Sequence, residues 1–127
     1  NKYLTECKKF KDKKFNNLGD KNVARDSDHL ARPESNIRSA GFTIEEREAF
    51  TKLINDNNLT HVYKYIHPNT TPMKYTYWDY KTKARERNVG WRIDYVMASE
   101  SIKALIKNAR IHPDAMGSDH CPVGVAL

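Results

Sequence analysis

Three short polar stretches carry the side chains of this chain that could do chemistry. They read Gly19-Asp20-Lys21-Asn22, Arg92-Ile93-Asp94 and Gly117-Ser118-Asp119-His120. Each lies where a strand end or a tight loop is expected. Taken singly, each has an ordinary explanation: an aspartate in a turn, an exposed ion pair between Arg92 and Asp94, or a surface histidine. It is their combination that suggests a reaction.

Asp94 needs a partner, because it interrupts an otherwise apolar strand pattern where an unpaired carboxylate would be costly. Histidine is a natural partner, since the carboxylate fixes its tautomer and stabilises its protonated form. Asp119 and His120 are neighbours, and successive residues of a strand point to opposite faces. Both can reach one site only from a loop before the last strand, and Gly117 and Pro122 suit such a loop.

This set of groups suits hydrolysis of a phosphodiester, a reaction that needs an activated water and cations to stabilise the charge that develops. Asp20 would accept the proton of the water, and Asn22 would orient the water or a phosphate. His120, held by Asp94, would donate to a phosphate oxygen. Asp119 would bind Mg²⁺, which favours carboxylate and water oxygens. No CxxC or HExxH spacing supports a zinc site.

Composition narrows the class of partner. The chain of 127 residues has 22 Lys and Arg against 16 Asp and Glu, a net charge of +6. That balance suits a polyanion such as nucleic acid, although a soluble basic protein needs no such partner. No apolar run predicts a membrane span and no signal peptide is evident, so no membrane partner is expected. Cys7 and Cys121 show no framework spacing and predict reduced thiols in an intracellular protein.

Four strands are expected to carry the polar groups. The segment from Trp91 to Ala98 alternates, with Trp91, Ile93, Tyr95 and Met97 on one face. The other expected strands are a poor one within 16–24, an aromatic one over Tyr75–Tyr80 and a closing one over Cys121–Leu127. A further short strand is expected at 109–111.

Helices and loops are expected to complete a single α/β or α+β domain. Thr43 and Glu46 form a capping box ahead of a helix over 43–56. A basic amphipathic helix is expected over 2–15, and another helix over 100–108 with Ile102, Leu105 and Ile106 inward. Residues 59–65 form an element of undecided type. Polar or basic loops are expected at 25–40 and 81–88.

The polar stretches and their surroundings resemble the exonuclease III-type AP endonucleases, within the wider endonuclease/exonuclease/phosphatase superfamily. The resemblance covers nearly the whole chain from residue 18, in the family's order. "SDHxP" marks only the superfamily, whereas "AGFT..ER" with "NVGWRIDY" is much more specific. The matching stretches are 18–24, 40–47, 75–80, 88–95 and 117–122.

The resemblance implies an α/β fold, the C-terminal portion of a four-layer α/β sandwich with two mixed β-sheets flanked by helices. Residues 1–127 would then be the C-terminal part of a single endonuclease/exonuclease/phosphatase domain whose N-terminal half is absent. It implies Mg²⁺-dependent cleavage of double-stranded DNA 5′ to an abasic site, with Mn²⁺ as the alternative ion. It also implies 3′→5′ exonuclease or 3′-phosphodiesterase activity on blocked 3′ ends. The full-length protein is expected to be a monomer, nuclear in a eukaryote or cytoplasmic in a prokaryote.

Matching positions take on the family's roles one by one. Asp20 resembles the aspartate that positions or deprotonates the water, and Asn22 the asparagine that contacts the phosphate. Asp94 and His120 resemble its Asp-His pair, and Asp119 its metal-site aspartate, with His120 beside the metal. Tyr77, Trp91 and Ile93 resemble the apolar pocket for a flipped abasic sugar, which physically suits a small base-free sugar. Lys81, Lys83 and Arg85 lie where they could follow the phosphate backbone. Trp78, Tyr95 and Cys121 are expected to be core residues.

Three departures from the family pattern stand beside the resemblance. The N-terminal half, which carries an asparagine, a metal-site glutamate and a catalytic tyrosine, is absent, and this leaves the activity of the chain alone open. Polar residues precede Asp20, and Lys21 replaces an apolar residue. His29 stands where the family usually has an aspartate. The alternatives are another metal-dependent phosphodiesterase of the superfamily and a non-catalytic DNA-binding remnant.

Overall fold

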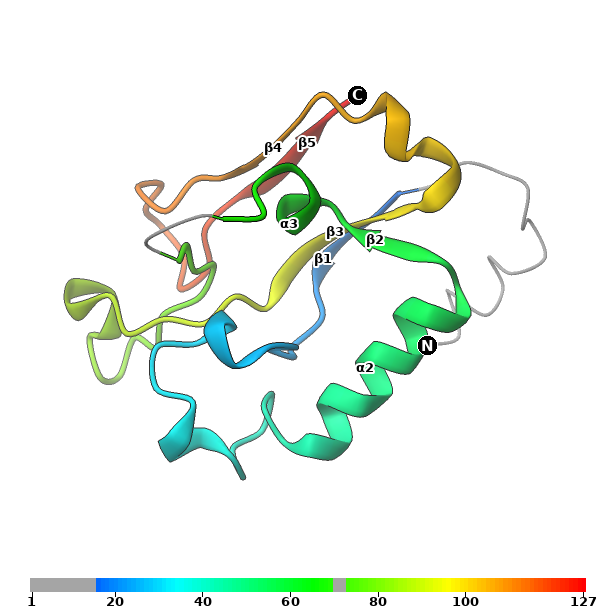
Figure 1. The fold of residues 1–127 in the computed structure, drawn as a ribbon. Helices are drawn as coiled ribbons and strands as arrows, with labels where there is room; N and C mark the ends of the chain where they lie inside the picture. The colour runs from blue at the N-terminus through cyan, green and yellow to red at the C-terminus, as the bar shows by residue number, and fades with distance from the viewer. Residues whose placement is uncertain (1–15, 70–72) are drawn as a thin grey trace.

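Two antiparallel sheets and two α-helices make up the part of the chain that the computed structural model describes, residues 16–69 and 73–127 (Figure 1). The expected helix over 2–15, with Cys7, lies outside these residues. The three-stranded sheet has the order β1-β3-β2 and the two-stranded sheet pairs β4 with β5. The elements are β1 (Asn16–Asp20), α2 (Ile44–Asp56), β2 (Leu59–His61), α3 (Val62–Ile66), β3 (Asp94–Ser99), β4 (Asn108–Ile111) and β5 (Val123–Ala126), with short 3₁₀ helices η2 (Ser27–His29), η3 (Glu34–Asn36), η4 (Ala84–Arg87) and η5 (Glu100–Leu105). The predicted mixed α/β class is confirmed. All strand pairs described are antiparallel.

The central strand β3 separates two apolar cores. Tyr95 and Met97, on one face, pack in a cluster with Phe50 of α2. Val96 and Ala98, on the other face, belong to the cluster that also holds Val62, Tyr63, Trp78, Ile102, Ala109 and Cys121. Figure 1 shows α2 on one side of the sheet and α3 with the β4–β5 pair on the other. The predicted alternation of β3 is confirmed, and both of its faces are buried.

The capping box predicted for α2 is present and reaches beyond the helix. Thr43 Oγ1 accepts a hydrogen bond from the backbone N–H of Glu46 (3.3 Å) and donates one to Glu46 Oε1 (2.7 Å). The same Oε1 accepts the backbone N–H of Gly41 (2.9 Å). The predicted 43–56 helix is confirmed, and its first turn also fixes the loop before it.

Other predicted strands are confirmed with small shifts, while one is wrong. The strands expected in 16–24, 109–111 and 121–127 are β1, β4 and β5, and the undecided segment 59–65 contains β2 and most of α3. Tyr75–Tyr80 is not a strand. Its backbone groups divide between two partners, because Thr76 and Tyr77 donate to Trp91 O while Trp78 donates to Asp119 O.

The expected helix over 100–108 is instead the 3₁₀ helix η5. Ile102 and Ile106 are buried as predicted, but Leu105 is half exposed. The helix ends at Leu105, and extended backbone at Ile106 turns that side chain into the core in place of Leu105. Within the described ranges, no helix has the length and apolar character to cross a membrane.

Candidate active site

Strand pairing places two carboxylates side by side. Asp20 is the last residue of β1 and Asp94 the first of β3, and the antiparallel register sets them directly opposite each other. Directly opposite residues project to the same face, where like charges repel. The site therefore needs a compensating cation.

When protonated, His120 supplies that positive charge. Its Nδ1 lies 2.8 Å from Asp94 Oδ2, and its Nε2 lies 3.9 Å from Asp20 Oδ2. The Asp94 carboxylate thus accepts the Nδ1 proton and leaves Nε2 facing the more exposed Asp20. The predicted Asp94–His120 contact is present, as a hydrogen-bonded pair at the first residue of the central strand β3.

The segment around Thr76 carries His120 to this position. Tyr77 forms isolated β-bridges with both Trp91 and His120. The backbone N–H of Cys121 donates to Thr76 O (2.8 Å). Thr76 has no exposed surface, and its Oγ1 lies 3.1 Å from the backbone nitrogens of Ile93 and Asp94, whose N–H groups donate to it. Sequence pattern alone does not single out this threonine, because its role depends on contacts between distant segments.

The acidic neighbours favour the protonated form of His120. Burial alone would lower the pKa of His120, but the hydrogen bond and charge of Asp94 act in the opposite direction. The charges of Asp20 and Asp119 add to that effect, and the pKa of His120 is raised overall. The imidazole can therefore donate a proton from Nε2 over a wider pH range than an isolated histidine.

A pocket of about 330 Å³ opens beside this histidine. It is lined by Asn22, Ala40, Gly41, Tyr77, Asp79, Trp91, Ile93 and His120. The predicted pocket residues Tyr77, Trp91 and Ile93 are therefore brought together, and the Tyr77 ring lies 5.0 Å from the His120 ring, centroid to centroid. A larger hollow of about 460 Å³ beside α2 contains none of the predicted site residues.

Gly41 keeps one wall of the pocket in place. Its φ is +92°, and a Cβ there would lie 3.1 Å from the Asn22 carbonyl oxygen and 3.2 Å from the Trp91 ring. Phe42 meets the same ring edge-on, and Arg47 lies over Phe42 while donating to Arg25 O (2.9 Å). The "AGFT..ER" motif thus shapes the pocket wall through the α2 cap.

Asn22 and Asp119 occupy less constrained positions. Asn22 has a left-handed backbone (φ 56°), lines the pocket and donates its backbone N–H to Asp20 Oδ1 (2.7 Å). Asp119 is half-buried, and Ser118 Oγ donates a long hydrogen bond to its Oδ1 (3.4 Å). Among the described residues, Asp20, Asp94 and His120 have candidate metal-ligand atoms that lie within 4.8 Å of one another here. The predicted metal-site role of Asp119 stays a prediction.

The basic loop divides into exposed and internal side chains. Lys81 and Lys83 are exposed, as a contact to DNA requires. The guanidinium of Arg85 donates to the carbonyls of Pro113, Ala115 and Ser118, and its predicted phosphate contact stays a prediction. Those bonds leave it turned toward the chain itself.

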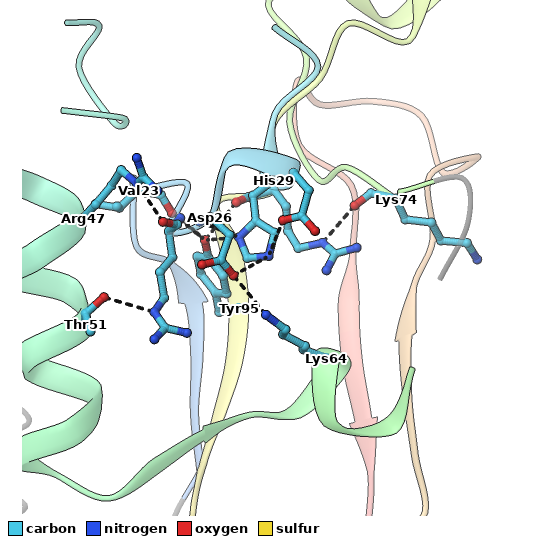
Figure 2. Close-up of polar contacts among 11 residues, drawn as sticks. Val23, Asp26, His29, Arg47, Thr51, Lys64, Lys74 and Tyr95 are labelled. Atoms are coloured by element: carbon cyan, nitrogen blue, oxygen red, sulfur yellow. Dashed lines mark hydrogen bonds and ion pairs between the residues drawn. The ribbon is translucent and has the colours of Figure 1, made fainter. Parts of the chain in front are cut away.

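Polar side chains around Tyr95 and His29 form a network of hydrogen bonds and ion pairs (Figure 2). Tyr95 Oη donates to Val23 O (2.6 Å) and accepts the N–H of Arg25 (3.2 Å), which ties the segment after Asn22 to β3. His29 is almost fully buried, with its Nε2 3.6 Å from Asp26 Oδ2. Burial and the nearby Arg92 guanidinium lower the pKa of His29 to about 4.

The expected core residues are buried as predicted, whereas Arg92 and Asp94 do not form the exposed ion pair that was one explanation of their spacing. Trp78, Tyr95 and Cys121 are buried, and burial raises the pKa of the Cys121 thiol to about 11. Arg92 is not on a solvent face beside Asp94. It is buried, donates from Nε to Lys74 O (2.9 Å) and lies over the Tyr63 ring.

Comparisons with known proteins find similar sequences among DNA nucleases. No protein-family model matches the chain. An exodeoxyribonuclease of Bacillus subtilis is 45% identical over 109 residues, which are 86% of this chain and 42% of that protein. The DNA repair nuclease APEX1 of Danio rerio is 41% identical over 109 residues, 86% of this chain and 34% of that protein.

A solved structure shares the fold. The AP endonuclease of Leishmania major superposes with a TM-score of 0.82 at 31% identity, covering 87% of this chain and 34% of that one. The chain therefore spans between about a third and two fifths of the length of these proteins.

Proposed function

We propose that this chain, a homologue of the exodeoxyribonucleases and AP endonucleases over most of its length, is the C-terminal part of a DNA repair endonuclease that cuts 5′ to an abasic site. One observation carries the proposal. The Asp20, Asp94 and His120 side chains converge directly beside a small pocket whose walls include the apolar surfaces of Tyr77, Trp91 and Ile93. A site that handles an unpaired, base-free sugar needs both parts next to each other.

The proposed roles follow from the positions of the groups. Asp94 orients His120 and keeps it protonated, so that Nε2 can donate to an oxygen of the scissile phosphate. Asp20, the more exposed carboxylate, accepts the proton of the attacking water. Asn22 lies between Asp20 and the pocket and would hold the water or a phosphate oxygen in line.

The acidic side chains fit a hard divalent cation. Oxygen donors dominate the site, and the charge of Asp119 adds to those of Asp20 and Asp94 around His120. We propose that Asp119 binds Mg²⁺, or Mn²⁺ as the alternative, with His120 beside it. The bound ion would neutralise charge that develops on the phosphate and the leaving oxygen. An upstream segment would supply the remaining ligands that the resemblance implies.

The pocket suits the proposed substrate. Tyr77, Trp91 and Ile93 offer apolar surface to a sugar without a base. The same site could accept a blocked 3′ end, which would give the 3′→5′ exonuclease or 3′-phosphodiesterase activity. Lys81 and Lys83 would contact the backbone of double-stranded DNA. We expect an intracellular monomer when the protein is full length.

The test is incision of a duplex oligonucleotide that carries one tetrahydrofuran residue, by the full-length protein, with Mg²⁺ and with EDTA. We expect cutting only at the tetrahydrofuran site and only with the metal ion. An undamaged duplex of the same sequence is the control. Equal cutting of both duplexes would favour a general phosphodiesterase, and binding without any cutting would favour a DNA-binding remnant. Either result would contradict the proposed function.

A further inference from the structure

We propose that Arg85 is a positioning residue of this site. It holds the turn of residues 113–118, which precedes Asp119 and His120, and it does not contact DNA. The inference rests on the proposed function for its catalytic consequence. Its structural basis is that one guanidinium contacts both the carbonyl groups of this turn and the ring of Trp78.

From the edge of its guanidinium, Arg85 donates hydrogen bonds to three carbonyl groups of this turn. Its Nη2 lies 2.5 Å from Pro113 O and 2.6 Å from Ala115 O, and its Nη1 lies 3.1 Å from Ser118 O. Charge-assisted bonds of this kind are stronger than those between neutral groups. The planar guanidinium can satisfy several acceptors in fixed directions, which a lysine ammonium on a flexible stem cannot do as well.

The guanidinium also lies over the buried Trp78 ring, with its Cζ 4.5 Å from the ring centroid. Trp78 is itself fixed, because its Nε1 donates to Asn88 Oδ1 (3.0 Å) and a Cβ on Gly90 would lie only 2.6 Å from Nε1. The backbone N–H of Trp78 donates to Asp119 O (2.9 Å). Arg85 and Trp78 therefore hold the same turn at both ends.

The turn has reason to need this support. Gly117 has a φ of +110°, Met116 beside it is largely exposed, and Pro113 has no N–H to donate. Ser118 Oγ accepts the N–H of His120 (3.1 Å), so a shift of Ser118 would move His120 directly. The 2.8 Å contact between His120 and Asp94 depends on that position.

The experiment compares Arg85→Ala, Arg85→Lys and a control, Arg110→Ala, in the full-length protein. Arg110 is an exposed arginine on β4 and loses the same charge. Single-turnover incision of the tetrahydrofuran duplex gives the rate constant, and titration of that duplex at several salt concentrations gives Kd and its salt dependence. Local hydrogen exchange over residues 112–121 reports the turn without any need for cleavage.

We expect Arg85→Ala to slow incision by about 10- to 100-fold, because small misplacements of catalytic groups carry such penalties. Kd should change by less than about twofold, with an unchanged salt slope, since no phosphate contact is lost. Residues 112–121 should exchange faster than in the wild type. Arg85→Lys should recover part of the rate, added guanidinium ion should restore part of the rate of Arg85→Ala, and Arg110→Ala should match the wild type in every measurement.

Two results would overturn the proposal. One is a weaker Kd with a shallower salt slope for Arg85→Ala, which would make Arg85 a phosphate contact. The other is normal exchange over residues 112–121, which would mean that the turn does not depend on Arg85. If Arg85→Ala does not fold, Arg85→Lys carries the same comparison. If the wild type does not incise, the proposed function fails while the exchange measurement still decides the structural claim.

Discussion

At the residue scale, the site depends on one imidazole between two carboxylates. Asp94 is mostly buried and bonded to His120, whereas Asp20 is more exposed and farther from the ring. The two carboxylates can thus serve different purposes although they are the same residue type. Asp94 sets the charge and orientation of His120, and Asp20 remains available to a water molecule.

Asp94→Asn should shift the pH dependence of incision. Asp94 raises the pKa of His120 against the lowering effect of burial, so its removal lowers that pKa. The protonated donor is lost as pH rises through the pKa, and the alkaline limb of the rate should therefore move to lower pH. A pH profile of single-turnover incision by wild type and variant checks this. An alkaline limb that stays in place would show that His120 protonation is not what it reports.

Residue types and order were enough to predict the Asp94–His120 contact, because an acid inside an apolar strand requires a partner. Thr76 and Arg85 were not recognised as supports of the site. A threonine between aromatic residues looks like any strand residue, and an arginine in a basic loop looks like a phosphate contact. Their partners are backbone carbonyl and N–H groups, which have no identity in the sequence.

At the scale of elements, the first turn of α2 links stability to the shape of the pocket. The carboxylate of Glu46 accepts bonds from Thr43 and from the backbone of Gly41, and these bonds lower the pKa of Glu46. Gly41 in turn packs against Trp91 in the pocket wall. The helix cap and the pocket are therefore one structural unit.

Glu46→Ala should reduce the free energy of unfolding by about 1 kcal/mol, the usual worth of a capping interaction. It should also weaken binding of tetrahydrofuran-containing DNA, because Gly41 loses the acceptor that fixes it. Glu45→Ala, an exposed first-turn substitution, is the matched control. Urea unfolding and DNA titration measure both effects. A destabilised variant with unchanged DNA affinity would separate the cap from the pocket.

Elements with local signals were predictable and those with divided partners were not. The capping box and apolar spacing predicted α2 closely, and alternation predicted β3. Tyr75–Tyr80 has strand residues but donates its hydrogen bonds to two separate segments, so it forms bridges in place of a strand. Such a division is decided by distant parts of the chain.

At the scale of the whole molecule, β3 lies between two cores and carries Asp94 at its first residue. His29, His61 and Arg92 are each less than a tenth exposed, and both histidine rings lie beside the ring of Tyr95 on β3. Burial lowers the pKa of both histidines, with help from the Arg92 charge. Folding therefore keeps them neutral.

The protein should lose stability on acidification before its carboxylates titrate. A histidine with a depressed folded pKa binds a proton more readily when unfolded, so stability is full above the unfolded value and falls as pH drops toward about 4. For His29 the loss is on the order of 3 kcal/mol. Urea unfolding at several pH values should show a shallower loss for His29→Asn than for wild type or for the exposed control His112→Asn. Equal slopes in all three proteins would contradict the buried neutral state.

The central claim is that Asp20 and His120 act together on one phosphodiester. Its most direct test is single-turnover incision of the tetrahydrofuran duplex by full-length wild type, Asp20→Asn and His120→Gln, with Kd measured for each. We predict that each variant binds the duplex about as tightly as wild type but cuts it about 100- to 10,000-fold more slowly, the range for loss of a positioned acid or base. A rate within about tenfold of wild type for either variant would contradict the roles assigned to these residues.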